Sequence, residues 1–408
     1  MNWKLLVFIL LTIGYVYRMV LHFVSHRSAQ NPTPANVADV YDAETYTRWK
    51  AYMAEKNRLK LFSTTLSFAV SLILLFSGAY AAFAGLFPAH PFMQLFAIVL
   101  LETLTDIVAG VALSWVDTMV IEQKYGFNRT TTKTFIIDQI REFIIGLLIS
   151  TLLTTLLWWL HTAMGDWVIL LFAGVVFLFT LAISFLYGPV FSRLGNKFEP
   201  LEEGELKEKL MALLTKHGYQ VKAIEVMDAS RRTTKLNAYF TGFGKLKSIV
   251  LFDNLVNAMS TDEICAVFAH ELGHGLNKDV LKQQILNLGN LLLMALTVWL
   301  CVREPALHQA FGFAEVNYGF GFVLLGIGLG LVQPLTGLVM NAYSRMAEYR
   351  ADRQAVKEGY GPYLTAGLKK LAKENFAHLA PSPVLVALEY SHPPLSQRIA
   401  AIEEALKK

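Results

Sequence analysis

Long apolar stretches separated by shorter polar ones dominate this 408-residue chain. A helix needs about 20 mainly apolar residues to cross a bilayer, and the stretches reach that length. No small-residue cleavage site promptly follows the first of them, so we interpret it as a membrane anchor and not as a signal peptide. The pattern predicts a mainly α-helical, multi-pass membrane protein with seven transmembrane helices. The predicted spans run near 5–24, 64–87, 92–116, 142–160, 167–189, 284–302 and 319–343.

The polar stretch after the fifth span has the pattern of a soluble unit. Residues 201–217 have helical periodicity and an acidic first turn, and a glycine then ends the helix. Residues 221–227 and 248–252 are rich in β-formers and predict two strands, with a short strand and a glycine turn between them over 237–244. The sequence therefore predicts a small β element beside helices.

The order of these patterns divides the chain into four parts. Residues 25–63 are polar and predict either a helical extension of the first span or a loop. The tail predicts a helix around residue 348, a second helix over about 361–378, a proline-bearing loop and a final helix. The four parts are five membrane helices with their loops (1–189), a soluble segment (190–283), two further membrane helices (284–343) and a soluble tail (344–408).

Composition agrees with a membrane protein and adds an orientation. Hydrophobic residues make up 54% of the chain and charged residues 17%, and mean hydropathy is +0.42. Seven spans place the N-terminus and three short loops on one side, where Lys4 and Arg303 are the only basic residues. The other side carries nearly all remaining lysines and arginines, which makes it cytosolic by the positive-inside rule. A net charge of +4 indicates no nucleic-acid partner.

The candidate chemistry lies in His270-Glu271-Leu272-Gly273-His274, which fits the zinc peptidase pattern H-E-x-x-H. Residues i and i+4 share a helix face, so His270 and His274 can bind one zinc ion, and Glu271 can act on the metal-bound water. Ser260 and Glu263 form a potential capping box that starts a helix two turns earlier. The alternative is an ordinary amphipathic helix with two histidines.

A third zinc ligand is expected from the tail. Glu348 and Asp352 are also i and i+4, so Glu348 can complete a His-His-Glu set while Asp352 accepts the free N–H of a ligand histidine. The alternative is that Glu348 is a solvated carboxylate, and it is then expected to pair with one of three nearby arginines, Arg345, Arg350 or Arg353.

Two further sets of polar residues permit more than one interpretation. Glu102 and Asp106 in the third span, and Arg141 and Glu142 at the fourth, either pair within the helix bundle or line a cavity. His392, in Ser391-His392-Pro393-Pro394, is either a loop histidine without a chemical role or a donor to a developing oxyanion.

Taken together, these motifs resemble the integral-membrane CaaX prenyl protease of the a-factor-converting type, a zinc metalloprotease family related to the gluzincins. The likeness extends over nearly the whole chain, in order. The matching elements are His270–His274, Glu348–Asp352, Asn237–Phe243, Ile249–Asp253, Ser391–Leu395 and Tyr125–Asn128.

The resemblance implies a fold and a set of roles. Family members form a ring of seven long helices around a water-filled chamber, which a zincin-like protease domain caps on the cytosolic side. It implies that His270, His274 and Glu348 hold one Zn²⁺ per chain and that Glu271 is the general base. It also implies that Asp352 supports a ligand histidine and that His392 stabilises the oxyanion. Asn237 and Ala238 would lie in an edge strand that pairs with the substrate backbone.

The implied activity is hydrolysis of peptide bonds near the C-terminus of a peptide or protein segment, with membrane lipid as the surrounding partner. The family removes the last three residues after a prenylated cysteine. Two alternatives stay open, a membrane quality-control protease with broad substrates and a transporter or channel that uses the intramembrane carboxylates. The short external loops favour a bacterial inner-membrane protein; a eukaryotic member would reside in the endoplasmic reticulum or inner nuclear membrane.

Overall fold

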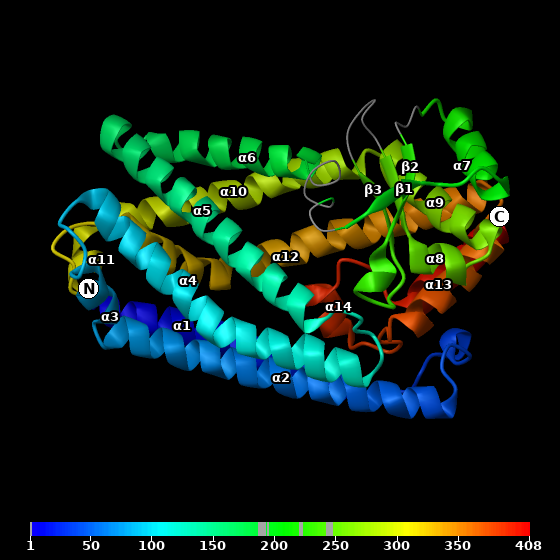
Figure 1. The fold of residues 1–408 in the computed structure, drawn as a ribbon, viewed down its shortest axis with the longest axis horizontal. Coiled ribbons are helices and arrows are strands. Elements are labelled where there is room, and N and C mark those ends of the chain that lie inside the picture. The colour runs from blue at the N-terminus through cyan, green and yellow to red at the C-terminus, as the bar shows by residue number, and fades with distance from the viewer. Residues whose placement is uncertain (1, 187–192, 194–195, 220–222, 242–247) are drawn as a thin grey trace.

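The computed structural model describes residues 2–186, 193, 196–219, 223–241 and 248–408. Long helices run along the elongated molecule, and a small sheet with several shorter helices lies at one end (Figure 1). The N-terminus lies at the helical end and the C-terminus at the end with the sheet (Figure 1).

Within the described part of the chain, six helices are long and apolar enough to cross a membrane. They correspond to all the predicted spans except the fifth, 167–189, which is represented by the apolar helix α6 (Val168–Leu186). Residues 187–189 of that span lie outside the described part of the chain. The six helices are α1 (Trp3–Ser28), α2 (Ala43–Phe76), α4 (Pro91–Trp115, continued by the π-helix η2, Val116–Glu122), α5 (Thr132–Met164), α10 (Asp279–Arg303) and α12 (Tyr318–Lys357).

Several of these helices extend well beyond the apolar residues that predicted them. Helix α2 begins at Ala43, where the Asp42 side chain accepts a hydrogen bond from the Thr45 N–H at 2.7 Å, although its apolar stretch begins near residue 64. The prediction that 25–63 extends the first span or forms a loop is therefore wrong for residues 43–63, which extend the second span. Hydropathy locates the part of a helix in contact with lipid and not the polar turns that continue it.

The four strands form one mixed sheet in the order β1-β2-β4-β3. The central strands β2 and β4 are parallel, and β1 and β3 pair antiparallel with them. Strand β1 was not predicted, because its three residues show no alternation. Residues 221–222 and 242–244 of the predicted strands lie outside the described residues. The strands are β1 (Phe198–Pro200), β2 (Ala223–Met227), β3 (Ala238–Thr241) and β4 (Ser248–Phe252).

Short helices surround this sheet and connect the membrane helices. Leucines of the first helix after β1 pack with strand residues and with the helix that carries the histidine motif in one buried core. The short helices are α3 (Ala79–Ala84), α7 (Glu205–Lys216), α8 (Asp253–Ala258), α9 (Thr261–Leu276), α11 (Pro305–Gln309), α13 (Gly361–Glu374), α14 (Pro383–Glu389) and α15 (Leu395–Leu406), with the 3₁₀ turns η1 (Ala35–Val37) and η4 (Ala229–Arg231).

The membrane helices and the soluble part are connected in two different ways around the site. Helix α9 does not run on into the sixth span, because Lys278 adopts a left-handed conformation (φ 54°) and a new helix, α10, begins at Asp279. By contrast, the helix of Glu348 is not a separate element, since α12 continues from the seventh span for 40 residues to Lys357.

Two cavities lie between the membrane helices. The larger, of about 550 Å³, is lined by residues of α1, α2, α12 and α14, and the other, of about 230 Å³, includes Glu102. The Glu102 carboxylate also accepts a hydrogen bond from the Tyr80 hydroxyl. Glu102 therefore both pairs within the helix bundle and lines a cavity. Asp106 is exposed. Arg141 and Glu142 contact neighbours on their own helix, at 3.3 Å from Asp138 and from Gln139 respectively.

Candidate metal centre

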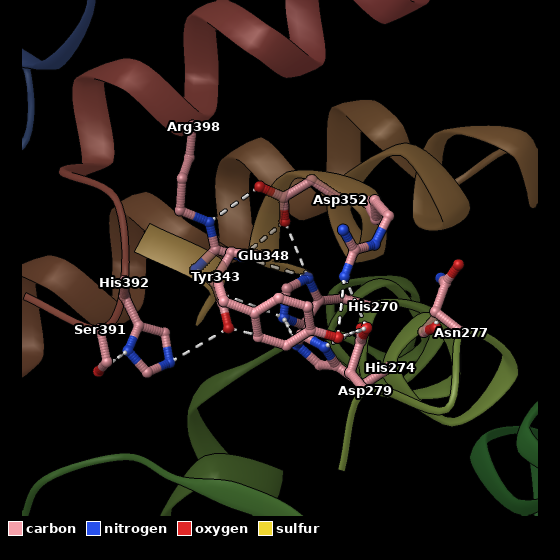
Figure 2. A network of polar contacts seen from close by, with 12 residues as sticks. His270, His274, Asn277, Asp279, Tyr343, Glu348, Asp352, Ser391, His392 and Arg398 are labelled. Atoms are coloured by element: carbon pink, nitrogen blue, oxygen red, sulfur yellow. Dashed lines mark hydrogen bonds and ion pairs between the residues drawn. The ribbon is translucent and has the colours of Figure 1, made fainter. Parts of the chain in front are cut away.

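The two motif histidines lie one turn apart on α9, as the i, i+4 spacing requires. The helix starts with the expected capping box, in which Ser260 Oγ accepts from the Glu263 N–H at 3.3 Å and the Glu263 carboxylate accepts from the Ser260 N–H at 2.8 Å. The His270 and His274 Nε2 atoms face each other at 3.2 Å. Figure 2 shows both rings between α9 and α12.

Gly273, inside the motif, allows the two ligand-bearing helices to approach. A Cβ atom at this position would lie 2.8 Å from Ala351 Cα and 3.0 Å from Gln354 Cβ on α12. Any larger side chain would separate the helices, and with them the histidines from Glu348. Helix–helix contact at a glycine explains a motif position that the sequence pattern leaves free.

Glu348 completes a group of three potential ligands. Its carboxylate oxygens lie 3.3 Å from His274 Nε2 and 3.5 Å from His270 Nε2, and the three ligand atoms all lie within 4.8 Å of one another. Glu348 Oε2 lies 3.3 Å from Nη1 of Arg398 on α15, so its arginine partner is not one of the three that are nearby in sequence. The carboxylate is buried, which also separates it from the solvated alternative.

The hydrogen bonds of the histidines fit a metal cation. His270 Nδ1 lies 2.8 Å from Asp352 Oδ1, and His274 Nδ1 lies 3.1 Å from Asp279 Oδ2. These carboxylates favour the N–H on Nδ1, which leaves both Nε2 lone pairs pointing at each other and at Glu348. Among the described residues, buried Glu348 Oε2 has no hydrogen-bond partner. Two imidazole nitrogens and a carboxylate oxygen are the donor set that zinc sites commonly use.

Electrostatics at the site also favour a cation. Burial alone would lower the pKa of His274, but the nearby Glu348, Glu271 and Asp279 carboxylates raise it to about 9. The same negative charges that strengthen proton binding on this ring would strengthen the binding of a divalent cation.

Two further groups at the site were not predicted from the sequence. Asp279, the first residue of α10, accepts from Arg350 at 2.7 Å and from the Tyr343 hydroxyl at 3.0 Å in addition to facing His274. Arg398 is buried and donates to both oxygens of Asp352, at 2.6 and 2.9 Å. The available signals were an acidic residue five positions after the motif and an arginine on the apolar face of the last helix.

The remaining predicted residues border the same space. His392 is exposed, with its Nε2 3.3 Å from Glu348 Oε1 and its Nδ1 2.9 Å from Ser391 Oγ (Figure 2). Glu271, Asn237 and Ala238 line a cavity of about 120 Å³ together with two of the three potential ligands, His270 and Glu348. The structure thus brings together every site residue that the sequence singled out; their individual roles stay predictions.

Strand β3 presents a free edge to this cavity. The Phe252 N–H donates to the Asn237 carbonyl at 3.1 Å, and Tyr239 pairs with Val250 of β4. Because hydrogen bonds alternate along an antiparallel pair, the Ala238 N–H and C=O point away from β4. The Ala238 N–H donates to the Asn237 side chain at 2.9 Å, a contact that an added strand would replace.

Comparison with known proteins identifies both halves of the chain. Residues 200–406 match the family described as peptidase family M48. Residues 23–197 match the family described as "CAAX prenyl protease N-terminal, five membrane helices".

Individual relatives cover almost the entire length. A "CAAX prenyl protease 1 homolog" of Oryza sativa subsp. japonica is 31% identical, with 97% of this chain and 96% of the relative aligned. "CAAX prenyl protease 1" of Saccharomyces cerevisiae is 29% identical, over 100% and 96% respectively. The crystal structure of S. mikatae Ste24p superposes with a TM-score of 0.92 at 27% identity, covering 98% of this chain and 99% of that one. The chain therefore belongs to peptidase family M48, and it is a membrane-embedded metallopeptidase of the CAAX prenyl protease type.

Proposed function

We propose that the protein is a zinc endopeptidase that cleaves near the C-terminus of membrane-associated peptides. The observation that carries the proposal is the convergence of two histidine Nε2 atoms and one glutamate beside Glu271. His270, His274 and Glu348 would hold one Zn²⁺. Asp352 would fix the ring of His270 through the contact at 2.8 Å.

The chain's own residues supply the remaining chemistry. When bound, zinc lowers the pKa of a water molecule and polarises the scissile carbonyl. Glu271 accepts the proton of the attacking water and passes it to the leaving amine. His392 lies at the rim of the site, beside Glu348, where its ring can donate to the oxygen that becomes negative in the transition state.

The free edge of β3 supports a mode of substrate binding. A peptide added to this edge would accept a hydrogen bond from the Ala238 N–H and donate one to the Ala238 C=O, displacing Asn237 from the first of these. Main-chain pairing of this kind holds an extended peptide next to Glu271 without depending strongly on its sequence.

The substrate class follows from the relatives. Proteins named as CAAX prenyl proteases align over nearly the whole of this chain, including both the membrane helices and the site. We infer that the substrate is a C-terminal segment ending in CaaX, with a prenylated cysteine.

The same proposal includes a topology. Adding α6 to the six long apolar helices would give seven spans, and the distribution of lysine and arginine supports a cytosolic position for the metal centre. Cysteine-scanning with a membrane-impermeant thiol reagent, on a variant without Cys265 and Cys301, tests this sidedness.

The first test compares wild type with Glu271→Gln, both purified in detergent, on a farnesylated CaaX peptide and its unprenylated twin. We expect one zinc per chain in both proteins and cleavage by wild type alone, because the variant loses only the base. Tripeptide release is followed by mass spectrometry.

The outcomes separate the parts of the proposal. Preference for the farnesylated peptide supports the CaaX assignment, whereas equal cleavage of both peptides favours a protease with broad substrates. Turnover that survives in Glu271→Gln would refute the assigned mechanism.

A further inference from the structure

Asn375 connects two segments that are far apart in sequence and that both line the peptidase cavity. Its Oδ1 accepts from the Leu236 N–H at 3.0 Å and its Nδ2 donates to the Leu236 C=O at 3.1 Å. The two residues are 139 positions apart. A side-chain amide that satisfies both backbone groups of one residue replaces a neighbouring strand.

The two connected segments are the walls of the cavity beside Glu271. Leu236 precedes Asn237 and Ala238 at the start of β3, and Asn375 is the C-cap of α13. Both segments line the cavity of about 120 Å³, β3 with Asn237 and Ala238 and α13 with Leu364, Leu368 and Leu371. The Asn375 amide is therefore a direct polar link between these two walls, beside the apolar packing that they share.

The turn that carries Asn375 is itself fixed from the membrane half. Phe376 adopts a left-handed conformation (φ 52°), which a phenylalanine rarely does, and its carbonyl accepts from Trp49 Nε1 of α2 at 3.1 Å. Its ring packs edge-on against Tyr52 and Phe127. An unfavourable backbone conformation persists only where its surroundings impose it, so the contacts of Phe376 with Trp49, Tyr52 and Phe127 fix the conformation of this turn.

The approach to β3 is fixed from the same side. The Arg129 N–H donates to the Arg232 C=O at 3.0 Å, the Thr234 N–H donates to the Phe127 C=O at 3.2 Å, and Lys235 Nζ lies 3.1 Å from Glu122. The residues before Leu236 thus contact the end of η2 and the loop that follows it.

We propose that Asn375 is a positioning residue that sets the width of the peptide-binding groove between the β3 edge and α13. The inference rests on the proposed addition of the substrate to β3. With the amide in place, the free N–H and C=O of Ala238 are held ready for a peptide backbone, so little ordering is needed when substrate binds. Without it, the two backbone groups of Leu236 lose their partners and the strand is free to shift.

The test measures KM and kcat of Asn375→Ala on the farnesylated CaaX peptide. We expect KM to rise about tenfold with kcat within about threefold of wild type and zinc content unchanged, because the lost contacts act on binding and not on the transition state alone. Asn317→Ala is the matched control. Like Asn375, Asn317 makes side-chain hydrogen bonds to backbone, accepting from the Phe320 N–H and donating to the Gln94 C=O, but it lies at the start of α12, far from the site.

A second measurement separates positioning from general destabilisation. N-methylation of the peptide amide that pairs with Ala238 should raise KM for wild type, and this penalty should shrink in Asn375→Ala because the edge is no longer held in place. Asn375→Asp keeps the acceptor for the Leu236 N–H but sets a carboxylate oxygen against the Leu236 C=O, so KM should rise in this variant too, with zinc content unchanged.

The results distinguish this inference from the function beneath it. Failure of wild type to cleave, or indifference of wild type to every N-methyl position, refutes the proposed function or its strand addition. An N-methyl penalty that is the same in wild type and Asn375→Ala, or a KM change no larger than that of Asn317→Ala, overturns the role of Asn375.

Discussion

Each of the two candidate ligand histidines faces a carboxylate, but the two carboxylates come from different parts of the chain. Asp352 is on the same helix as Glu348, whereas Asp279 is the first residue of the following membrane helix. Asp279 also receives Arg350 and Tyr343 from α12. The orientation of His274 thus depends on the contact between two membrane helices and not on α9 alone.

Asp279→Ala should weaken metal binding about 10- to 100-fold, because His274 loses the acceptor that favours its correct tautomer. Competition with a calibrated chelator measures the affinity. Asp279→Asn, which keeps an acceptor oxygen, should lose less. An unchanged affinity in the alanine variant would show that His274 is oriented by other groups.

His392→Ala should lower kcat about 100-fold with the metal still bound, since a donor to the oxyanion is lost and no ligand is. The ring is exposed, so the change should leave folding intact. Ser391→Ala, which removes only the 2.9 Å contact to the ring, is the control and should have a smaller effect. Loss of metal from His392→Ala would instead make the residue a ligand or a structural support.

At this scale the sequence predicted residues that are neighbours on one helix. His270 and His274, or Glu348 and Asp352, follow from the i, i+4 spacing. Asp279, Arg398 and Asn375 could not be found in this way, because their contacts join segments whose proximity depends on the whole fold. Aspartate, arginine and asparagine are common on protein surfaces, so their presence in the sequence does not indicate a position at the site.

At the scale of elements, polar turns decide how the membrane helices connect to the peptidase. The end of α1, the start of α2 and the loop after α13 meet around His378, whose Nε2 contacts Ser28 Oγ at 2.9 Å and whose ring packs edge-on against Trp49. The Ala380 N–H donates to His378 Nδ1 at 3.2 Å, so that nitrogen carries no proton. This junction requires a neutral imidazole.

Acidification should weaken this junction. Burial lowers the pKa of His378 to about 4, from 6.5 for an exposed histidine. Between these values the unfolded chain binds a proton that the folded chain does not, so stability falls as the pH falls through this window. Thermal unfolding in detergent at about pH 7 and about pH 5 should show a smaller loss for His378→Asn, which keeps an acceptor but cannot be protonated. Equal losses in both proteins would exclude His378 as the cause.

Elements with a strong local signal were predicted well, and those without one were not. The capping box at Ser260 and the β-rich residues of β4 gave α9 and the central strand. The polar half of α2 was missed because the apolar stretch begins near residue 64, well after the helix begins at Ala43.

At the scale of the whole molecule, the spacing of apolar stretches predicted a multi-pass helical protein with a soluble peptidase part, and six long apolar helices agree with it. The sequence alone did not predict how the two halves of the chain contact each other. The loop after η2 and the residues before β3 meet through backbone hydrogen bonds, which any residue can make. Contacts of this kind cannot be predicted from residue type.

Helix α12 extends from the far end of the membrane region to the metal centre. Asn317 caps its first turn, and Glu348 lies in its C-terminal part. These residues are separated by about 46 Å along the axis at about 1.5 Å per residue. For a rigid helix of this length, a tilt of about one degree displaces one end by nearly 1 Å relative to the other. Transmembrane helices adjust their tilt to the hydrocarbon thickness around them. We therefore expect the distance from Glu348 to the two histidines, and with it the geometry of the reaction, to vary with the thickness of the host bilayer.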